Sequence, residues 1–254
     1  MNVKGVSGLE SHTRVIELVG PAGAGKTSLA EELEKGSGYY RTAAPPYFRN
    51  LAEIPFFFTN LVTFLPVLSR MMLDAKRRKP SPRQIVWMLT LQGWHNRMRE
   101  PRDHGDRISL LDQGPIFIMT DLYRTRCINL QDRLIKTWWG GVIDHWAQTL
   151  DGVVLLDAPN KDLIERIRSR RKWHLMKERS DLDLITFLED YRLWFERVLA
   201  QLSAKNSSLR VIRLNSARLN VSEMAAKTSV ELGLTTSVEA YPGADSSKQA
   251  YLSV

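Results

Sequence analysis

Near its start the chain carries a glycine-rich segment whose spacing suits it to binding phosphate groups. Gly20 to Thr27 reads GPAGAGKT and matches G-x-x-x-x-G-K-T, the Walker A motif or P-loop. Gly20, Gly23 and Gly25 permit backbone angles that a side chain would forbid, so the N–H groups of the loop can turn inward around an anion. A helix N-terminus directly after the loop would also favour negative charge.

Two side chains at the end of this motif have separate expected roles. Lys26 is expected to reach the β- and γ-phosphates of a nucleotide, and the Thr27 hydroxyl to bind Mg²⁺. The apolar run Arg14–Val19 predicts a buried parallel strand before the loop, and residues 27–35 predict a helix that stops at Gly36. The predicted nucleotide contacts in this segment are Gly20, Pro21, Ala22, Gly23, Ala24, Gly25, Lys26, Thr27 and Ser28.

A second chemical pattern, RISLLDQGP, spans Arg107 to Pro115 and ends its apolar run at Asp112. In P-loop proteins a carboxylate at the end of such a strand binds or orients Mg²⁺, and in kinases it can also accept the proton of the attacking hydroxyl. The alternative is that Asp112 only caps the following helix. Because the P-loop motif is also present, the pattern favours a catalytic and metal-binding Asp112.

A third pattern is the arginine-rich segment Asn160 to Arg179, NKDLIERIRSRRKWHLMKER. Arginine forks match the negative charge that phosphoryl transfer spreads over the equatorial oxygens, and a mobile lid would carry them over the phosphates. We predict that Arg166 and Arg170 bind the nucleotide and that Arg168 and Arg171 take part in the transfer. The alternative is a basic helix face exposed to solvent.

The elements that must position these residues alternate between strand and helix. This alternation predicts an α/β fold, a three-layer sandwich of a parallel sheet with helices on both faces. We expect one domain over residues 1–254, with a helical insertion at 45–105 and a loose C-terminal tail at 235–254. The five strand candidates are Arg14–Val19, Tyr39–Thr42, Arg107–Asp112, Gly152–Asp157 and Leu209–Asn215.

The expected insertion contains two helical stretches, Leu51–Lys79 with a break at Pro66, and Pro82–Arg99. Within the first, Ile54–Ser69 carries no charge but is shorter than the roughly 18–20 residues that span a bilayer. A buried helix pair is the favoured interpretation. The alternative is a helix on the membrane surface, which would give peripheral membrane contact through residues 54–79.

Composition limits the class of protein. The 254 residues have 43% hydrophobic and 25% charged content, as is usual for a soluble globular protein. Cys127 is the single cysteine, so no internal disulfide can form, and the polar stretch from Met1 to Thr13 does not resemble a signal peptide. A reducing cytoplasm is therefore expected. The net charge of +8 is compatible with nucleic acid, an anionic membrane or polyanionic small molecules.

On three segments the chain resembles P-loop nucleoside and nucleotide kinases, in particular thymidylate-kinase-like proteins. VIELVGPAGAGKTSLA, LLDQGP and VVLLDAPNKDLIERIRSRR occur in the order of that group's P-loop, strand-3 acidic motif and strand-4-plus-lid segment. The resemblance covers about two thirds of the chain and implies a P-loop NTPase fold with strand order 2-3-1-4-5. It also implies ATP as donor and transfer of its γ-phosphoryl group, with roles for Lys26, Thr27, Asp112 and the Arg166–Arg171 group.

The acceptor site departs from the family pattern. Thymidylate kinases have an Asp-Arg-Tyr/His-type motif near the acidic strand end, whereas Gln113 and Gly114 follow Asp112 here. The acceptor therefore stays open between nucleoside- or nucleotide-like and sugar-like small molecules. Gln92 and Arg97, at the end of an inserted helix, could line its pocket or simply form a polar helix terminus. The predicted acceptor-binding residues are Gln92, Arg97, Gln113 and Arg41.

Other functional classes compete with a kinase. A switch GTPase is excluded, because Asn160-Lys161-Asp162-Leu163 misplaces the aspartate that reads guanine and Asp112-Gln113-Gly114 lacks D-x-x-G spacing. A regulatory ATP-binding P-loop ATPase without a small-molecule acceptor remains the alternative. A nucleic-acid enzyme rests only on the net charge, so nucleic acid is not an expected partner. A homodimer is compatible with the sequence.

Overall fold

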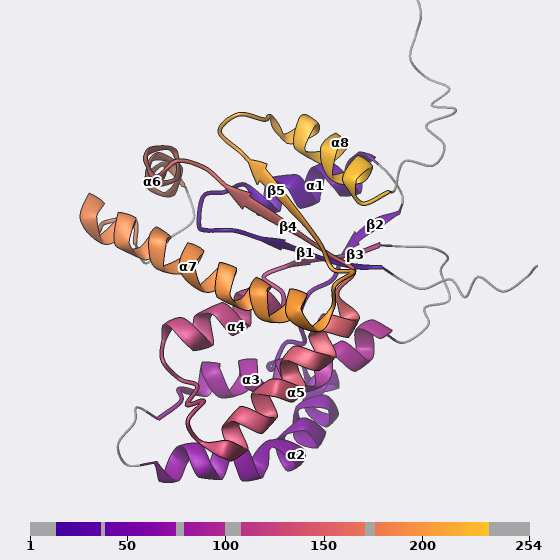
Figure 1. Cartoon of the computed structure of the whole chain (residues 1–254), viewed down its shortest axis with the longest axis vertical. Coiled ribbons are helices and arrows are strands. Elements are labelled where there is room, and N and C mark those ends of the chain that lie inside the picture. Colours follow the sequence, from indigo (N-terminus) through magenta and orange to yellow (C-terminus); the bar gives the residue numbers. More distant parts are fainter. Residues whose placement is uncertain (1–13, 37–38, 75–78, 100–107, 171–175, 234–254) are drawn as a thin grey trace, which may run out of the picture.

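The computed structural model describes residues 14–36, 39–74, 79–99, 108–170 and 176–233. Its centre is a sheet of five parallel strands in the order β2-β3-β1-β4-β5 (Figure 1). This confirms the predicted order 2-3-1-4-5 and the parallel α/β architecture, and each predicted strand lies within one residue of the observed bounds. The strands are β1 (Val15–Val19), β2 (Tyr40–Thr42), β3 (Ile108–Asp112), β4 (Gly152–Asp157) and β5 (Arg210–Asn215).

Helices cover both faces of this sheet, which gives the predicted three layers. Figure 1 shows α1 and α8 on one face and α4 and α7 on the other, with α5, α3 and α2 farther out on that second side. The helices are α1 (Lys26–Gly36), α2 (Ile54–Leu73), α3 (Pro82–Arg99), α4 (Pro115–Arg124), α5 (Arg133–Thr149), α6 (Asn160–Ser169), α7 (Asp181–Lys205) and α8 (Val221–Glu231); a 3-10 turn (Leu51–Glu53) precedes α2.

The apolar strand β1 is buried on both of its faces. Ile16 and Leu18 belong to the hydrophobic core under α1 and α8, whereas Val15 and Val19 belong to the core under α4, α5 and α7. All five residues of β1 are buried, as expected for a central strand of a sheet covered on both sides. The strand that carries the P-loop is therefore held rigidly from above and below.

The register of the sheet brings the two main sequence motifs to one edge. Leu18 of β1 lies beside Asp112 of β3, and Val19 lies beside Leu155 of β4. Since all strands are parallel, the P-loop after β1 and the turn after β3 leave the sheet at the same carboxyl edge. Ligands of open α/β sheets bind at this edge.

Two expectations about the segment before Pro80 are wrong. Pro66 does not break the helix, because α2 runs continuously from Ile54 to Leu73 with Pro66 inside it and exposed. Nor is this a buried pair of helices. Leu51–Leu73 is long and apolar enough to cross a membrane by length and composition alone, and only 17% of its most apolar stretch is buried. The second predicted stretch, Pro82–Arg99, forms α3 as expected.

Two glycines inside helices give a matched test of this packing. At Gly140 in α5 an added Cβ would meet no atom within 4 Å, whereas at Gly93 in α3 it would lie 2.3 Å from the Asn60 side-chain amide. Asn60 donates that amide to the Phe56 carbonyl at 2.8 Å. We expect Gly140→Ala to raise the free energy of unfolding by about 0.5–1 kcal/mol, through helix propensity.

We expect Gly93→Ala to lower the free energy of unfolding instead. The added methyl group would displace the Asn60 amide from its position between α2 and α3. Urea unfolding of both variants checks this prediction. Equal stabilisation by both substitutions would contradict the close α2–α3 contact.

Candidate functional site

The P-loop has the backbone conformation that its glycines predict. Gly20, Gly23 and Gly25 have φ values of 148°, 86° and 93°. A Cβ at Gly20 would lie 2.1 Å from the Leu156 carbonyl oxygen, so β4 itself excludes any side chain there. At Gly25 no atom of the described residues other than its chain neighbours lies within 4 Å of that position, so here the positive φ is the reason for glycine. The loop therefore leads from β1 into α1 with its glycines in the left-handed conformations that an anion nest needs.

Lys26, the first residue of α1, lies across this loop. Its Nζ donates hydrogen bonds to the carbonyl oxygens of Gly20 at 2.7 Å and Pro21 at 3.1 Å. Burial lowers the pKa of the ammonium to about 8; the Asp112 carboxylate opposes this shift and the positive charge of Arg170 adds to it. The charge of Lys26 is thus poorly solvated, and a polyanion bound in the loop would stabilise it.

Asp112 and Thr27 meet at the carboxyl edge of the sheet, as their motifs predict. The Thr27 hydroxyl donates to Asp112 Oδ2 at 2.9 Å, and this bond connects residues 85 positions apart. A carboxylate and a hydroxyl are hard oxygen donors. Mg²⁺ is commonly bound by one or two carboxylates together with phosphate oxygens and waters. The pair therefore fits Mg²⁺, and in the described part of the chain no cluster of three His, Cys, Asp or Glu residues offers another metal site.

The turn after Asp112 is conformationally unusual. Gln113 has a φ of 63°, a left-handed conformation that non-glycine residues rarely adopt, and its side chain is exposed. Such strain collects at functional sites when the surrounding structure enforces it. The next residue, Gly114, packs directly against Glu17. A Cβ at Gly114 would lie 2.7 Å from the Glu17 carboxyl carbon, so only glycine fits at this position.

Glu17 is a site residue that the sequence analysis missed. It is completely buried in β1, and its carboxyl oxygens accept hydrogen bonds from the backbone N–H groups of Ile116 at 2.9 Å and Phe117 at 3.0 Å. Burial raises the pKa of Glu17 to about 8, although these two backbone hydrogen bonds favour its charged form. The available signal was an acidic residue in the middle of an otherwise apolar buried strand.

Glu17 thus holds the start of α4 against β1, three residues ahead of the P-loop. Since α4 begins three residues after Asp112, this contact also fixes the turn that carries Asp112.

The arginine-rich segment is only partly as predicted. Helix α6 ends at Ser169, so Arg170 follows the helix, and Arg171 lies outside the described residues. Arg166 donates to the Gly23 carbonyl at 3.3 Å and to the hydroxyl and carbonyl oxygens of Ser216, both at 2.9 Å. It therefore joins the P-loop to the segment after β5.

Two further arginines of this segment have different surroundings. Arg168 does not point into the loop, because it forms an ion pair with Asp181 at the start of α7. Arg170 is exposed just after α6, and its positive charge adds to the lowering of the Lys26 pKa.

The predicted acceptor residues Gln92 and Arg97 have other partners in this structure. The Gln92 amide bonds to Thr63 at 2.6 Å and to the Trp138 indole at 2.7 Å. Arg97 pairs with Glu53, and both of these residues lie within the α2–α3 region. Arg41 is exposed on the edge strand β2. Only Gln113 lies directly beside Asp112.

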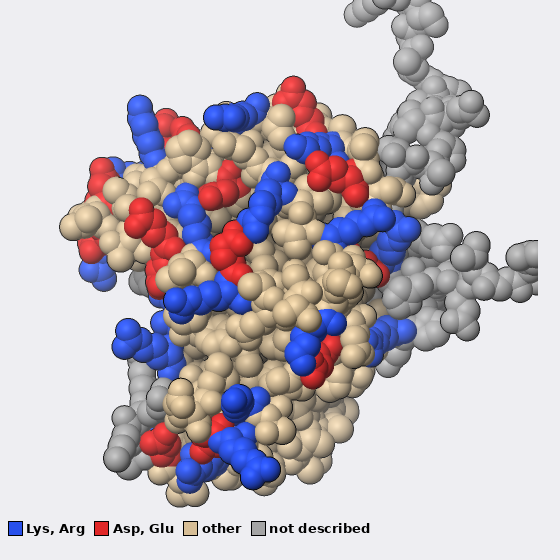
Figure 2. Space-filling view, viewed as in Figure 1, with Lys and Arg blue, Asp and Glu red and all other residues tan. Residues whose placement is uncertain are grey.

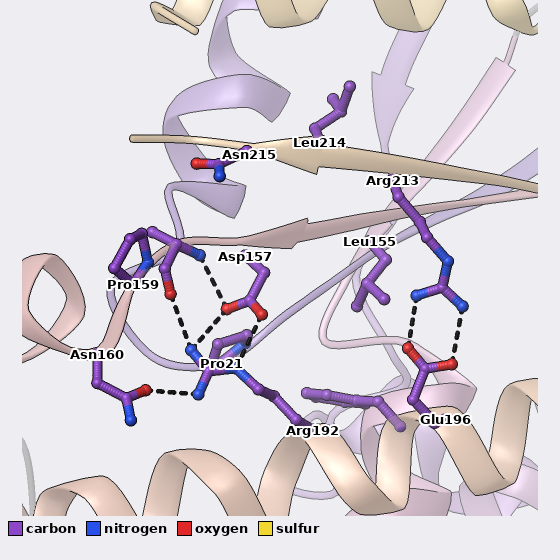
Figure 3. Close-up of a pocket in the computed structure, with 12 residues that line it drawn as sticks. Pro21, Leu155, Asp157, Pro159, Asn160, Arg192, Glu196, Arg213, Leu214 and Asn215 are labelled. Carbon is purple, nitrogen blue, oxygen red and sulfur yellow. Dashed lines mark hydrogen bonds and ion pairs between the residues drawn. The ribbon is translucent and has the colours of Figure 1, made fainter. Parts of the chain in front are cut away.

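A cavity of about 650 Å³ opens next to the P-loop at Pro21 (Figure 3). It lies between the carboxyl ends of β4 and β5 and helix α7. Arg192 donates to both oxygens of Asp157, at 2.8 and 2.9 Å, and Arg213 pairs with Glu196. The sequence analysis did not identify this cavity, although Asp157 ends β4 just as Asp112 ends β3.

Comparison with solved structures identifies the architecture. Thymidylate kinase from Candida albicans superposes with a TM-score of 0.51 at 12% sequence identity, over 88% of this chain and 92% of that chain. The fold is that of a P-loop kinase. Structures of deoxyadenosine kinase from M. mycoides with bound dCTP and with bound dATP give TM-scores of 0.47 and 0.46. Their sequence identities are 16% and 18%; 87% and 86% of this chain and 99% and 98% of theirs are covered. Scans of protein-family models and of curated proteins found no match.

The raised pKa of Glu17 leads to a prediction about the stability of the fold. The folded-state pKa of about 8 exceeds the ordinary value of 4.5, so the stability from protonated Glu17 is full below pH 4.5 and is lost as the pH rises through 8. Glu17→Gln removes this titration. We expect the unfolding free energy of the variant, relative to the natural protein, to improve between pH 5 and 8.5 by up to about 1.4 kcal/mol per pH unit.

Urea titrations at several pH values measure this difference, and Glu165→Gln, at an exposed position of α6, is the control. If the difference in unfolding free energy between Glu17→Gln and the natural protein stays constant with pH, Glu17 is already ionised in the folded state.

Proposed function

We propose that this protein is an ATP-dependent phosphotransferase that moves the γ-phosphoryl group of ATP to a small-molecule acceptor. The observation that carries the proposal is the contact between Thr27 and Asp112, which joins the P-loop to the acidic end of β3 in a P-loop kinase fold. A phosphate nest alone would serve many nucleotide-binding proteins. A carboxylate held against the loop threonine adds a group that can bind a metal ion and accept a proton.

Each residue of the loop has a defined task in this proposal. The backbone N–H groups of the P-loop and the Lys26 ammonium bind the β- and γ-phosphates, and Thr27 and Asp112 hold Mg²⁺. When bound, Mg²⁺ would neutralise charge on the phosphate oxygens. Arg166 keeps the loop attached to the segment after β5, and Arg170 supplies a further positive charge near Lys26.

The transfer itself requires little covalent chemistry from the protein. An acceptor oxygen forms a bond to the γ-phosphorus while the bond from that phosphorus to the β–γ bridging oxygen breaks, and ADP leaves. If the acceptor is a hydroxyl, its proton passes to the Asp112 carboxylate. Arg168 and Arg171 are proposed to stabilise the transferred group, which for Arg168 requires release from Asp181.

The acceptor is expected beside Gln113, where the exposed amide projects from the turn that bears Asp112. We propose a nucleoside-, nucleotide- or sugar-like molecule that Gln113 recognises by hydrogen bonds, with Arg41 as a further candidate. Gln92 and Arg97 are further candidates, and each would have to exchange its contacts with Thr63 and Trp138, or with Glu53, for contacts with the acceptor. A cytoplasmic location follows from the chemistry of ATP and from the single buried thiol of Cys127.

The absence of the family arginine after Asp112 also supports a second candidate. Without that arginine the site could bind and hydrolyse ATP as a regulatory ATPase that has no small-molecule acceptor. A nucleic-acid substrate has less support, because on the face shown in Figure 2 the basic residues are interspersed with acidic ones instead of forming a continuous stripe.

A screen of ATP consumption with nucleosides, nucleotides, sugars and sugar phosphates tests the proposal. ADP formation that depends on one acceptor class, with that acceptor phosphorylated, is the expected result. ADP formation independent of every acceptor would support the regulatory ATPase.

Substitutions at two positions separate binding from transfer. Lys26→Ala should lower kcat/KM by about 100-fold or more, because it removes a positive charge that stabilises the transferring group. Asp112→Asn should lower kcat by about 10²–10⁴-fold while changing the Kd for ATP much less. Steady-state kinetics and calorimetric titration with ATP measure these effects.

Asp144→Asn, at a surface carboxylate of α5 paired with Lys205, is the matched control. Full activity of Lys26→Ala would overturn the P-loop assignment, and equal effects of Asp112→Asn on kcat and Kd would assign Asp112 a structural role.

The lowered pKa of Lys26 predicts how ATP affinity depends on pH. Below about pH 8 the ammonium is already charged, and bound phosphates raise its pKa further. Above pH 8, binding must take up a proton, so affinity should fall by up to tenfold per pH unit. Calorimetric titrations from pH 7 to 9.5 should show this decline in the natural protein and in Lys35→Ala. Lys26→Ala should not show it, and a decline that persists in that variant would implicate another group.

A further inference from the structure

The turn between β4 and α6 is bound by an arginine from α7. Arg192 donates from Nε to Asp157 Oδ2 at 2.8 Å and from Nη2 to Asp157 Oδ1 at 2.9 Å. The same guanidinium also donates to the Ala158 carbonyl at 2.8 Å and to the side-chain oxygen of Asn160 (Figure 3). A single side chain therefore binds most of the turn that leads into α6.

This turn has no side-chain cap of its own. The N-cap residue of α6 is Pro159, which makes no side-chain hydrogen bond to the helix, whereas a capping side chain normally fixes the entry of the chain into a helix. Arg192 is carried by a helix that the core holds in place, since its neighbours Tyr191 and Phe195 are buried. The start of α6 is therefore held from outside, by α7.

Asp157 is fully engaged in this contact. Like Asp112, it ends a strand at the carboxyl edge of the sheet. Both of its carboxyl oxygens accept from Arg192, and Oδ1 also accepts from the Ala158 N–H at 2.8 Å. A guanidinium fork on a carboxylate fixes orientation as well as distance. Asp157 thus anchors the turn, whereas Asp112 is bound to the threonine of the P-loop.

The same turn is connected to the P-loop through the segment after β5. The backbone carbonyl of Asp157 accepts hydrogen bonds from the Ser216 N–H at 2.8 Å and from the Ser216 hydroxyl at 3.4 Å. Ser216 accepts in turn from Arg166 of α6, and Arg166 also donates to the Gly23 carbonyl at 3.3 Å. A continuous chain of hydrogen bonds therefore runs from α7 to the P-loop.

Helix α6 also lies directly against the P-loop. A Cβ added at Gly23 would be 3.1 Å from the Leu163 carbonyl oxygen and 3.4 Å from the Arg166 Cβ. Leu163 and Ile167 share a hydrophobic core with Ala24 of the loop. A displacement of α6 would therefore be transmitted to the loop backbone.

We infer that Arg192 is a positioning residue of the phosphate site: it holds the turn that starts α6, and α6 holds the P-loop. The kinetic consequence rests on the proposed phosphoryl transfer, whereas the effect on the loop backbone does not. Transfer is more sensitive than binding to small displacements, because a misplacement of about 1 Å can cost about 100-fold in rate. Loss of the Arg192 fork should therefore lower kcat more than it weakens ATP binding.

Arg192→Lys and Arg213→Lys form a matched pair of variants. Both arginines line the same cavity and fork onto a carboxylate, but the partner of Arg213 is Glu196 of α7 instead of the turn. Lysine keeps the charge and loses the fork. We expect Arg192→Lys to lower kcat by about 10-fold or more and to change the Kd for ATP by no more than about threefold. Arg213→Lys should leave both unchanged.

The kinetic readout is ADP formation from ATP and Mg²⁺, with water alone and with the nucleosides, nucleotides, sugars and sugar phosphates of the screen. Calorimetric titration with ATP gives the Kd. A residue that only stabilised the fold would lower the free energy of unfolding without separating kcat from Kd.

Hydrogen exchange of the nucleotide-free protein gives a second readout that needs no turnover. The amides of residues 20–25 should exchange at least about threefold faster in Arg192→Lys than in the natural protein, and at the natural rate in Arg213→Lys. Exchange in β1 and β3 should stay the same in both variants, which separates a local loosening of the P-loop from general destabilisation.

Unchanged exchange of the P-loop in Arg192→Lys would overturn the inference, as would equal effects of this substitution on kcat and Kd. If the natural protein transfers phosphate to no acceptor, the proposed function fails, and the exchange measurement alone decides the role of Arg192. If Arg192→Lys does not fold, Asp157→Asn weakens the same fork from its other side and should show the same pattern of exchange.

Discussion

The parallel pairing of β1 with β3 is the constraint on which the rest of the site depends. It places Asp112 beside Leu18, so that the carboxylate reaches the threonine that ends the P-loop. Because all five residues of β1 are buried, the strand that leads into the loop is fixed within the sheet. The contact is therefore built into the fold, without the need for a ligand to assemble it.

Glu17 reinforces this arrangement from inside the core. Its carboxyl group receives the first N–H groups of α4, and its bulk excludes any side chain at Gly114. Burying a carboxyl group is costly unless it is hydrogen-bonded or neutral. Both conditions are met here, since two N–H groups bind it and burial raises its pKa to about 8. The left-handed Gln113 lies in the turn that these contacts confine.

The helices on the other side of the sheet extend well beyond the phosphate site. Beyond α4 and α7, helices α5, α3 and α2 form an apolar layer that extends away from the phosphate site. In this layer Gln92 and Arg97 are occupied by contacts with Trp138 and Glu53. Their polar groups stabilise helix packing here, and the same helices leave one face of α2 exposed.

The sequence by itself determined the strands, their parallel order through a family resemblance, and the P-loop, because glycine spacing and apolar runs are local properties of the chain. It also placed Lys26, Thr27 and Asp112 in the site, since each ends or follows a recognisable strand. Glu17 could not be assigned, because its partners lie 99 and 100 residues away. Only the tertiary structure showed that α2 continues through Pro66 and that much of this helix is exposed. Hydropathy reports how apolar a helix is, and only the packing of its neighbours determines which face they cover.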